Sequence, residues 1–186
     1  MHTNEPYDIV MPGRLCLLGE HSDWAGGYRR QAPELVPGFC LITPTDQVIA
    51  ARASRLPGRL QLRSRVGDLP VAREITLSMH RGELAHLARA GGFFSYIAGV
   101  VHEAAGSYEV DGLALDAYAM DLPMKKGLSS SAAVCMLAAR ALNLTAALGL
   151  DINQEMDLAY RGELLTGSQC GRMDQACAFK RPVWLS

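Results

Sequence analysis

The sequence predicts a single domain that mixes β-strands with α-helices. Its 186 residues are enough for one domain with a substantial core. Hydrophobic residues make up 49% and charged residues 20%, which is typical of a folded globular protein. Short apolar or alternating segments fill the first half of the chain, whereas longer segments with helical spacing dominate the second half. Periodicity alone indicates a mixed α/β fold.

The chain begins with predicted strands and loops. Residues 7–11 form a short apolar strand that Pro12-Gly13 breaks, and residues 14–18 form a second, buried strand. A polar loop rich in glycine follows at residues 19–28. The polar residues 31–37, with two prolines, indicate an insertion. Four further strands are predicted at residues 38–43, 47–54, 60–64 and 71–77.

Helices dominate the remainder. Two are predicted at residues 80–90 and 93–105, separated by Gly91-Gly92, and Gly106 ends the second. Residues 112–121 alternate as a strand does. An Ala- and Leu-rich buried helix is predicted at residues 132–148, followed by one that Asp151 or Asn153 caps and that runs to residue 165. A loop at residues 167–175 and a strand at residues 176–185, broken by Pro182, complete the chain.

The segment at residues 123–133 is where a strand meets a helix, and it suits an anion. Gly127 precedes a run of serines, and the first N–H groups of a helix have no partner within it. Those groups and the helix dipole together hold phosphate. Ser129 is the candidate N-cap, and two lysines, at 125 and 126, add positive charge at the mouth. The alternative is an ordinary capped helix that binds nothing.

The loop after residue 18 carries Glu20, His21 and Asp23 within four positions. Two carboxylates and an imidazole can accept hydrogen bonds from several hydroxyl groups at once. Loops held on a rigid strand are common binding sites. The pattern therefore favours a polyol or sugar ligand, and the alternative is a solvated turn.

Three segments carry a family resemblance. Residues 13–24 resemble the N-terminal signature of galactokinases, and residues 170–175 resemble the galactokinase segment that holds the catalytic aspartate. Residues 123–133 resemble the phosphate loop of the wider GHMP kinase superfamily, which includes homoserine, mevalonate and phosphomevalonate kinases. The resemblance implies that residues 1–186 form the N-terminal ATP-binding domain. Its implied fold is α+β, a two-layer α/β arrangement similar to ribosomal protein S5 domain 2.

The resemblance also implies roles for individual residues. Asp174 is the expected general base, with Arg14 beside it to stabilise developing charge. The sugar would contact the three polar residues of the loop after residue 18. The expected phosphate contacts are Lys125, Gly127, Leu128, Ser129, Ser130 and Ser131. Magnesium, bound with ATP, would contact Ser131 first and Glu163 second; the alternative for Glu163 is a solvated helix residue.

The expected partners follow from the same comparison. GHMP kinases carry a second, C-terminal lobe, which we expect to pack on this chain and to be absent from it. A net charge of −1 argues against nucleic-acid or membrane-surface partners. The five cysteines contain no CxxC pair, and the N-terminus does not resemble a signal peptide, so we expect a cytoplasmic protein. Two alternatives stay open: a kinase for a non-sugar alcohol such as mevalonate or homoserine, and a non-catalytic sensor or inactive lobe.

Overall fold

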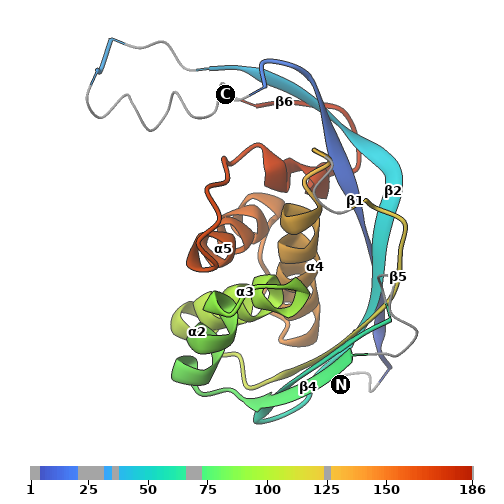
Figure 1. Ribbon diagram of the computed structural model, residues 1–186, viewed down its shortest axis with the longest axis vertical. Helices are drawn as coiled ribbons and strands as arrows, with labels where there is room; N and C mark the ends of the chain where they lie inside the picture. Colours follow the sequence, from blue (N-terminus) through green and yellow to red (C-terminus); the bar gives the residue numbers. More distant parts are fainter. Residues whose placement is uncertain (1–4, 21–31, 35–37, 66–72, 124–126, 186) are drawn as a thin grey trace.

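The computed structural model describes residues 5–20, 32–34, 38–65, 73–123 and 127–185. It consists of two layers, a curved sheet and a group of helices that covers one face of it (Figure 1). The predicted two-layer α+β architecture is therefore confirmed. Within the described residues, no helix is long and apolar enough to cross a membrane.

The sheet contains six strands. They are β1 (Tyr7–Leu18), β2 (Cys40–Ser54), β3 (Arg59–Ser64), β4 (Arg73–Ser78), β5 (Leu113–Met120) and β6 (Val183–Leu185). The strand order is β1-β2-β5-β3-β4, and the short β6 pairs with the start of β2. Neighbouring strands are antiparallel except β3 and β5, which are parallel. The connection between these two parallel strands carries β4 and the first two helices.

Strand β1 continues through Pro12-Gly13, where the sequence predicted a break. The pairing with β2 shifts register between Pro12 and Arg14, as a β-bulge does. Before the bulge, Ile9 and Met11 face the core; after it, Arg14 is the buried residue. Because side chains alternate between the two faces of a strand, one extra residue reverses which positions point inward. The bulge thus turns the arginine toward the helices.

The helices are α2 (Arg81–Arg89), α3 (Phe93–Ser107), α4 (Ser130–Thr145), α5 (Ile152–Leu165) and the 3-10 helix η2 (Asp174–Phe179). The four α-helices of the described residues lie where the sequence predicted them. Asp151, rather than Asn153, caps α5, and it forms a reciprocal capping box with Gln154. Gly106 does not end α3, which continues to Ser107.

Two other predictions are wrong. Residues 40–54 form one continuous strand where two were expected, because β1 pairs with it on both sides of the predicted break, between Leu41 and Ala53. The strand expected at residues 176–185 is a 3-10 helix up to Phe179, and only the three residues after Pro182 pair with β2. Proline lacks the N–H that a ladder needs, so pairing begins beyond it.

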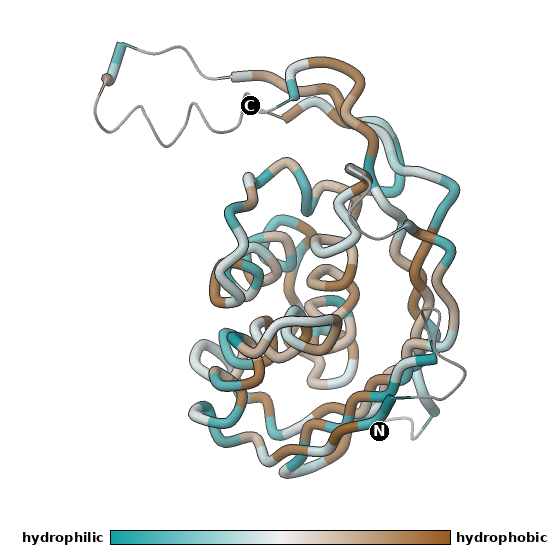
Figure 2. The backbone as a smooth tube through the Cα atoms, in the orientation of Figure 1, coloured by the Kyte–Doolittle hydropathy of each residue, from teal (hydrophilic) through white to brown (hydrophobic). Residues whose placement is uncertain are grey.

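The core lies between the inner face of the sheet and helices α3, α4 and α5, and helix α4 is its most buried element. Figure 2 shows apolar segments on the helices and along the strands that face them. Helices α3 and α5 approach closely at Gly99 and Gly162. A Cβ atom added to Gly162 would lie 2.5 Å from the backbone of Val100. This crossing fixes the position of the C-terminal part of α5.

Candidate active site

The first turn of helix α4 forms one side of the site. Ser129 stands at its N-cap in a left-handed conformation, with φ of 52° and ψ of 45°, which is uncommon for a residue with a side chain. The sequence predicted that its hydroxyl would cap the helix. Instead, the hydroxyl donates to Oδ1 of Asp174 at 2.7 Å. Backbone strain of this kind concentrates at functional sites. The hydrogen bond joins the helix start directly to the predicted base.

Strand β1 contacts this first turn of α4. The backbone N–H of Arg14 donates to the carbonyl of Leu128 at 3.2 Å. A Cβ atom at Gly13 would lie 2.8 Å from the same carbonyl oxygen, so only glycine allows the loop to rest on the strand. Gly13 was not among the predicted site residues, although its position immediately before Arg14 in the galactokinase-like segment was an available signal.

Arg14 and Asp174 meet at the centre of the site. Arg14 Nε donates to Asp174 Oδ1 at 2.9 Å, and Nη2 forms an ion pair with the same oxygen. The side chains are 7% and 19% exposed, so the pair is largely shielded from water. Glu20 Oε1 lies 3.6 Å from Arg14 Nη1 and is itself exposed. One oxygen of Asp174 therefore accepts hydrogen bonds from both the arginine and Ser129, which fix its carboxylate in orientation.

Glu163 lies at the end of α5 and is 1% exposed, so the interpretation as a solvated helix residue is wrong. The amide of Gln175 donates to its Oε2 at 2.9 Å. Burial raises the pKa of Glu163, and hydrogen bonds from Ser131 and Gln175 oppose that rise. The same shift reflects the nearby negative charge of Asp174. The carboxylate thus lies close to both the predicted base and the start of α4.

The donor set fits magnesium. Among the described residues, no cationic side chain forms an ion pair with Glu163, so a bound metal ion would supply the positive charge that favours its ionised form. Ser131 supplies a second hard oxygen beside it. In the described part of the chain, no three His, Cys, Asp or Glu side chains gather around a metal position. Magnesium commonly takes one or two protein ligands and completes its shell with water and phosphate oxygens, so this pair suffices.

Other predicted site residues divide into two groups. Gly127, with φ of 80°, is exposed at the start of the loop, and Ser130 is buried in the first turn of α4. His21, Asp23, Lys125 and Lys126 lie outside the described residues.

Two residues near Asp174 in the sequence, which were not predicted site residues, also contact Glu163. Gln175 contacts Glu163, and the thiol of Cys170 hydrogen-bonds to the same carboxylate. Burial, with the charges of Glu163 and Asp174, raises the pKa of Cys170 to about 12. The thiol is therefore protonated at neutral pH and acts as a donor rather than a nucleophile. Both residues lie in the motif at residues 170–175, which was the signal available.

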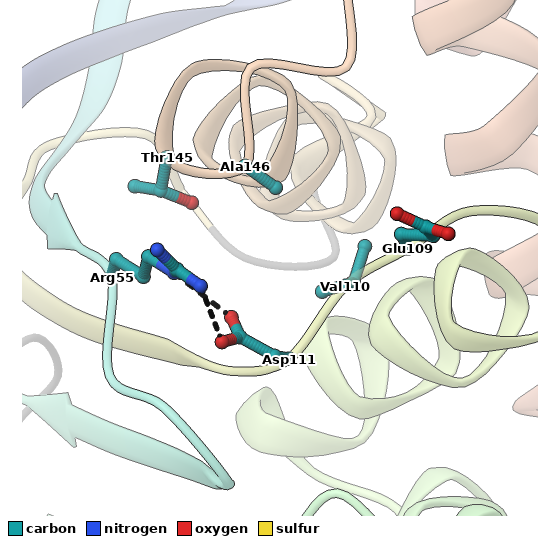
Figure 3. Close-up of a pocket in the computed structure, with 6 residues that line it drawn as sticks. All are labelled: Arg55, Glu109, Val110, Asp111, Thr145 and Ala146. Carbon is teal, nitrogen blue, oxygen red and sulfur yellow. Dashed lines mark hydrogen bonds and ion pairs between the residues drawn. The ribbon is translucent and has the colours of Figure 1, made fainter. Parts of the chain in front are cut away.

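A separate cavity of about 340 Å³ lies at the opposite end of α4 (Figure 3). The ion pair between Arg55 and Asp111 lines it, with Thr145 and Ala146 at the helix end. A helix of 16 residues is roughly 24 Å long. This cavity is therefore remote from Asp174 and holds none of the predicted site residues.

Comparisons with known proteins agree with the geometry. Residues 93–181 match the family described as GHMP kinases N terminal domain. The chain is 32% identical over 188 residues to a galactokinase of Streptomyces coelicolor, covering 94% of this chain and 41% of that protein.

Solved structures show the same fold. The structure resembles the mevalonate kinase of Methanococcus jannaschii with a TM-score of 0.75 and 16% identity, covering 98% of this chain and 54% of the other. It resembles the galactokinase of Lactococcus lactis, complexed with galactose, with a TM-score of 0.74 and 21% identity, covering 98% and 47%. The chain thus spans about half the length of the proteins it matches, or less.

Proposed function

Because this chain belongs to the GHMP kinase superfamily through its N-terminal-domain segment, we propose that it is the ATP-binding lobe of a galactokinase-like sugar kinase. The reaction would transfer the γ-phosphate of ATP to a sugar hydroxyl. The observation that carries the proposal is the meeting of Arg14, Asp174 and Ser129 at the start of α4. These residues come from strand β1, from η2 and from the N-terminus of α4.

The phosphates of ATP would lie at the N-terminus of α4. The N–H groups of its first turn have no partner within the helix, and the dipole favours a negative charge there. Gly127 and Leu128 lead into this turn, and strand β1 holds the turn in place. Phosphoryl transfer depends mainly on alignment and on charge stabilisation, so a rigid anion-binding turn is the main contribution that the fold makes.

The acceptor hydroxyl would lie against the Asp174 carboxylate, which orients it and accepts its proton late in the transfer. Arg14 stabilises that carboxylate and the negative charge that develops on the transferring group. Glu20, beside Arg14, together with His21 and Asp23 would contact other hydroxyls of the sugar. Ser131 and Glu163 would hold magnesium, which would neutralise part of the negative charge of the phosphates.

The choice of a sugar over another alcohol rests on sequence. The folds of the mevalonate kinase and the galactokinase match this chain almost equally well, with TM-scores of 0.75 and 0.74. The match of 32% identity to a galactokinase favours the sugar. The alternative substrate is a non-sugar alcohol of the mevalonate or homoserine type.

A panel assay tests the proposal. ADP release is measured with MgATP and a series of sugars and non-sugar alcohols, for the chain alone and for the chain extended by a second lobe. We expect weak ATP binding and little turnover from the lobe alone, and sugar-dependent ADP release from the extended chain. Release that depends only on a non-sugar alcohol would replace the sugar proposal with the alternative.

Replacing the base separates a kinase from a sensor. Asp174→Asn should lower turnover by at least about 100-fold, since a positioned general base contributes roughly 10² to 10⁴ in rate, while ATP binding stays near its original value. Asp116→Asn, a matched change at an aspartate paired with Arg65, should leave turnover unchanged. Binding of ATP and sugar without any ADP release in the two-lobed form would support the non-catalytic sensor.

We further propose that the second lobe covers an apolar surface at the end of the sheet. Leu18, Phe39 and Trp184 are 61%, 57% and 65% exposed, although they lie where β1, β2 and β6 meet. Exposed apolar groups gathered in one place commonly mark a contact with another protein surface. Slower hydrogen exchange of the β6 amides in the two-lobed form would support this contact, and unchanged exchange would contradict it.

A cytoplasmic location is proposed on the cysteines. All five lie in the described residues, and none forms a disulfide. Proteins of reducing compartments rarely contain disulfides. A reporter fusion that fractionates outside the cytoplasm would contradict this proposal.

A further inference from the structure

Gln175 follows the proposed base directly, yet its side chain turns away to Glu163. Its Nε2 donates to Glu163 Oε2 at 2.9 Å, and this hydrogen bond is buried. Gln175 is 1% exposed. Contacts within the protein, and not solvent, therefore determine the direction of the Gln175 side chain.

The other end of the same amide has no hydrogen-bond partner. Gln175 Oε1 is buried, and no described residue donates to it. The side chain lines a small cavity of about 100 Å³ between α5 and the loop at Arg172, with Tyr160 and Asp157 also on its wall. An unsatisfied buried acceptor destabilises a folded protein. A methionine of similar length would avoid that penalty, so folding stability does not explain an amide at this position.

Contact with Glu163 does explain it. The described residues give this carboxylate neutral hydrogen-bond donors, from Gln175, Ser131, Cys170 and Ser168, and no cation. A lysine or arginine here would neutralise the carboxylate and compete with a metal ion. An amide N–H fixes the direction of the carboxylate and leaves its charge available to the metal.

We propose that Gln175 is a positioning residue that holds the Glu163 carboxylate in the direction required to bind magnesium. The proposal rests on the function proposed above, because it assigns a supporting role at the same metal site. Partners that orient metal ligands in this way typically change metal affinity by 10–100-fold when they are removed.

The test uses Mn²⁺ as a spectroscopic substitute for Mg²⁺ and measures its affinity in the presence of a non-hydrolysable ATP analogue by electron paramagnetic resonance. Gln175→Met should weaken Mn²⁺ binding at least about 10-fold, while affinity for the analogue without metal stays the same. Thermal unfolding monitors the fold, and we expect an unchanged or higher melting temperature. Gln175→Leu serves as a second variant if methionine packs poorly.

Gln61→Met is the matched control. Gln61 Nε2 also donates to a glutamate, Glu74 Oε1, at 3.0 Å, but on strands β3 and β4, outside the proposed site. Its replacement should not alter Mn²⁺ affinity. Wild-type affinity in folded Gln175→Met would overturn the proposal for Gln175 alone. Wild-type affinity in Glu163→Gln would instead overturn the metal site itself, and with it this inference.

Discussion

Replacing Gly162 with alanine tests how the crossing of helices α3 and α5 places Glu163. The added Cβ atom would lie 2.5 Å from the N and Cα atoms of Val100, whereas ordinary contact begins at 3.4 Å. Since backbone atoms cannot rotate away, the helices must separate by about 0.9 Å.

The expected destabilisation follows from two opposing effects. Overpacking a tight contact lowers the free energy of unfolding by about 1–3 kcal/mol, and a backbone obstacle favours the upper end of that range. Alanine regains about 1 kcal/mol over glycine inside a helix. The net loss is therefore about 2 kcal/mol, which lowers the melting temperature by roughly 4–8 °C for a domain of this size.

Gly106→Ala provides the control. It makes the same chemical change in α3, but the added Cβ atom would meet only the guanidinium group of Arg81, 2.9 Å away at the end of a flexible side chain. Differential scanning calorimetry should show an unchanged or slightly higher melting temperature for this variant. If Gly162→Ala melts at the same temperature as Gly106→Ala, the close crossing does not position α5, and the reasoning is refuted.

Two further substitutions test the charges of the site. Arg14→Met should lower the free energy of unfolding by about 2–3 kcal/mol, because it removes charge-assisted hydrogen bonds to Asp174 in a largely shielded position. A urea titration measures this loss, and an unchanged unfolding midpoint would contradict the contact. Glu163→Gln should stabilise the chain at neutral pH, because burial raises the pKa of Glu163 and the folded state binds its proton more tightly than the unfolded state. In the wild-type chain, the free energy of unfolding therefore falls as pH rises from the pKa of Glu163 in the unfolded state through its raised pKa in the folded state. Thermal unfolding should show a higher melting temperature for Glu163→Gln than for the wild type at pH 7 and no difference at pH 4.

Much of this fold could be predicted from the sequence. In the part of the chain that the structure describes, the four α-helices follow apolar residues at helical spacing and recognisable ends, such as the Asp151 capping box. The continuous β2 was harder to predict, because Pro44 and the polar residues after it are typical of a turn when considered without their partners. Local pattern cannot reveal that pairing with β1 on both sides of such a segment keeps the strand continuous.

The sequence predicted which residues form the site better than it predicted how those residues contact one another. Arg14 and Asp174 were identified through motifs, yet the β-bulge that turns Arg14 inward depends on pairing with a strand 30 residues away. The hydrogen bond from Ser129 to Asp174 displaced the expected helix cap, because tertiary contact with a charged acceptor is stronger than a local cap. The burial of Glu163 depends on the crossing of α3 and α5, which spacing alone does not indicate.

The most direct measurement is a nuclear magnetic resonance titration of the backbone amides of this 20.1 kDa chain with MgATP. Binding of phosphates at the start of α4 predicts that the largest shifts occur at residues 127–131, with further shifts at Glu163 and Asp174. Shifts centred instead on Arg55 and Asp111, at the remote cavity, or unchanged amides at the α4 N-terminus under saturating MgATP, would contradict the assignment of this site to ATP.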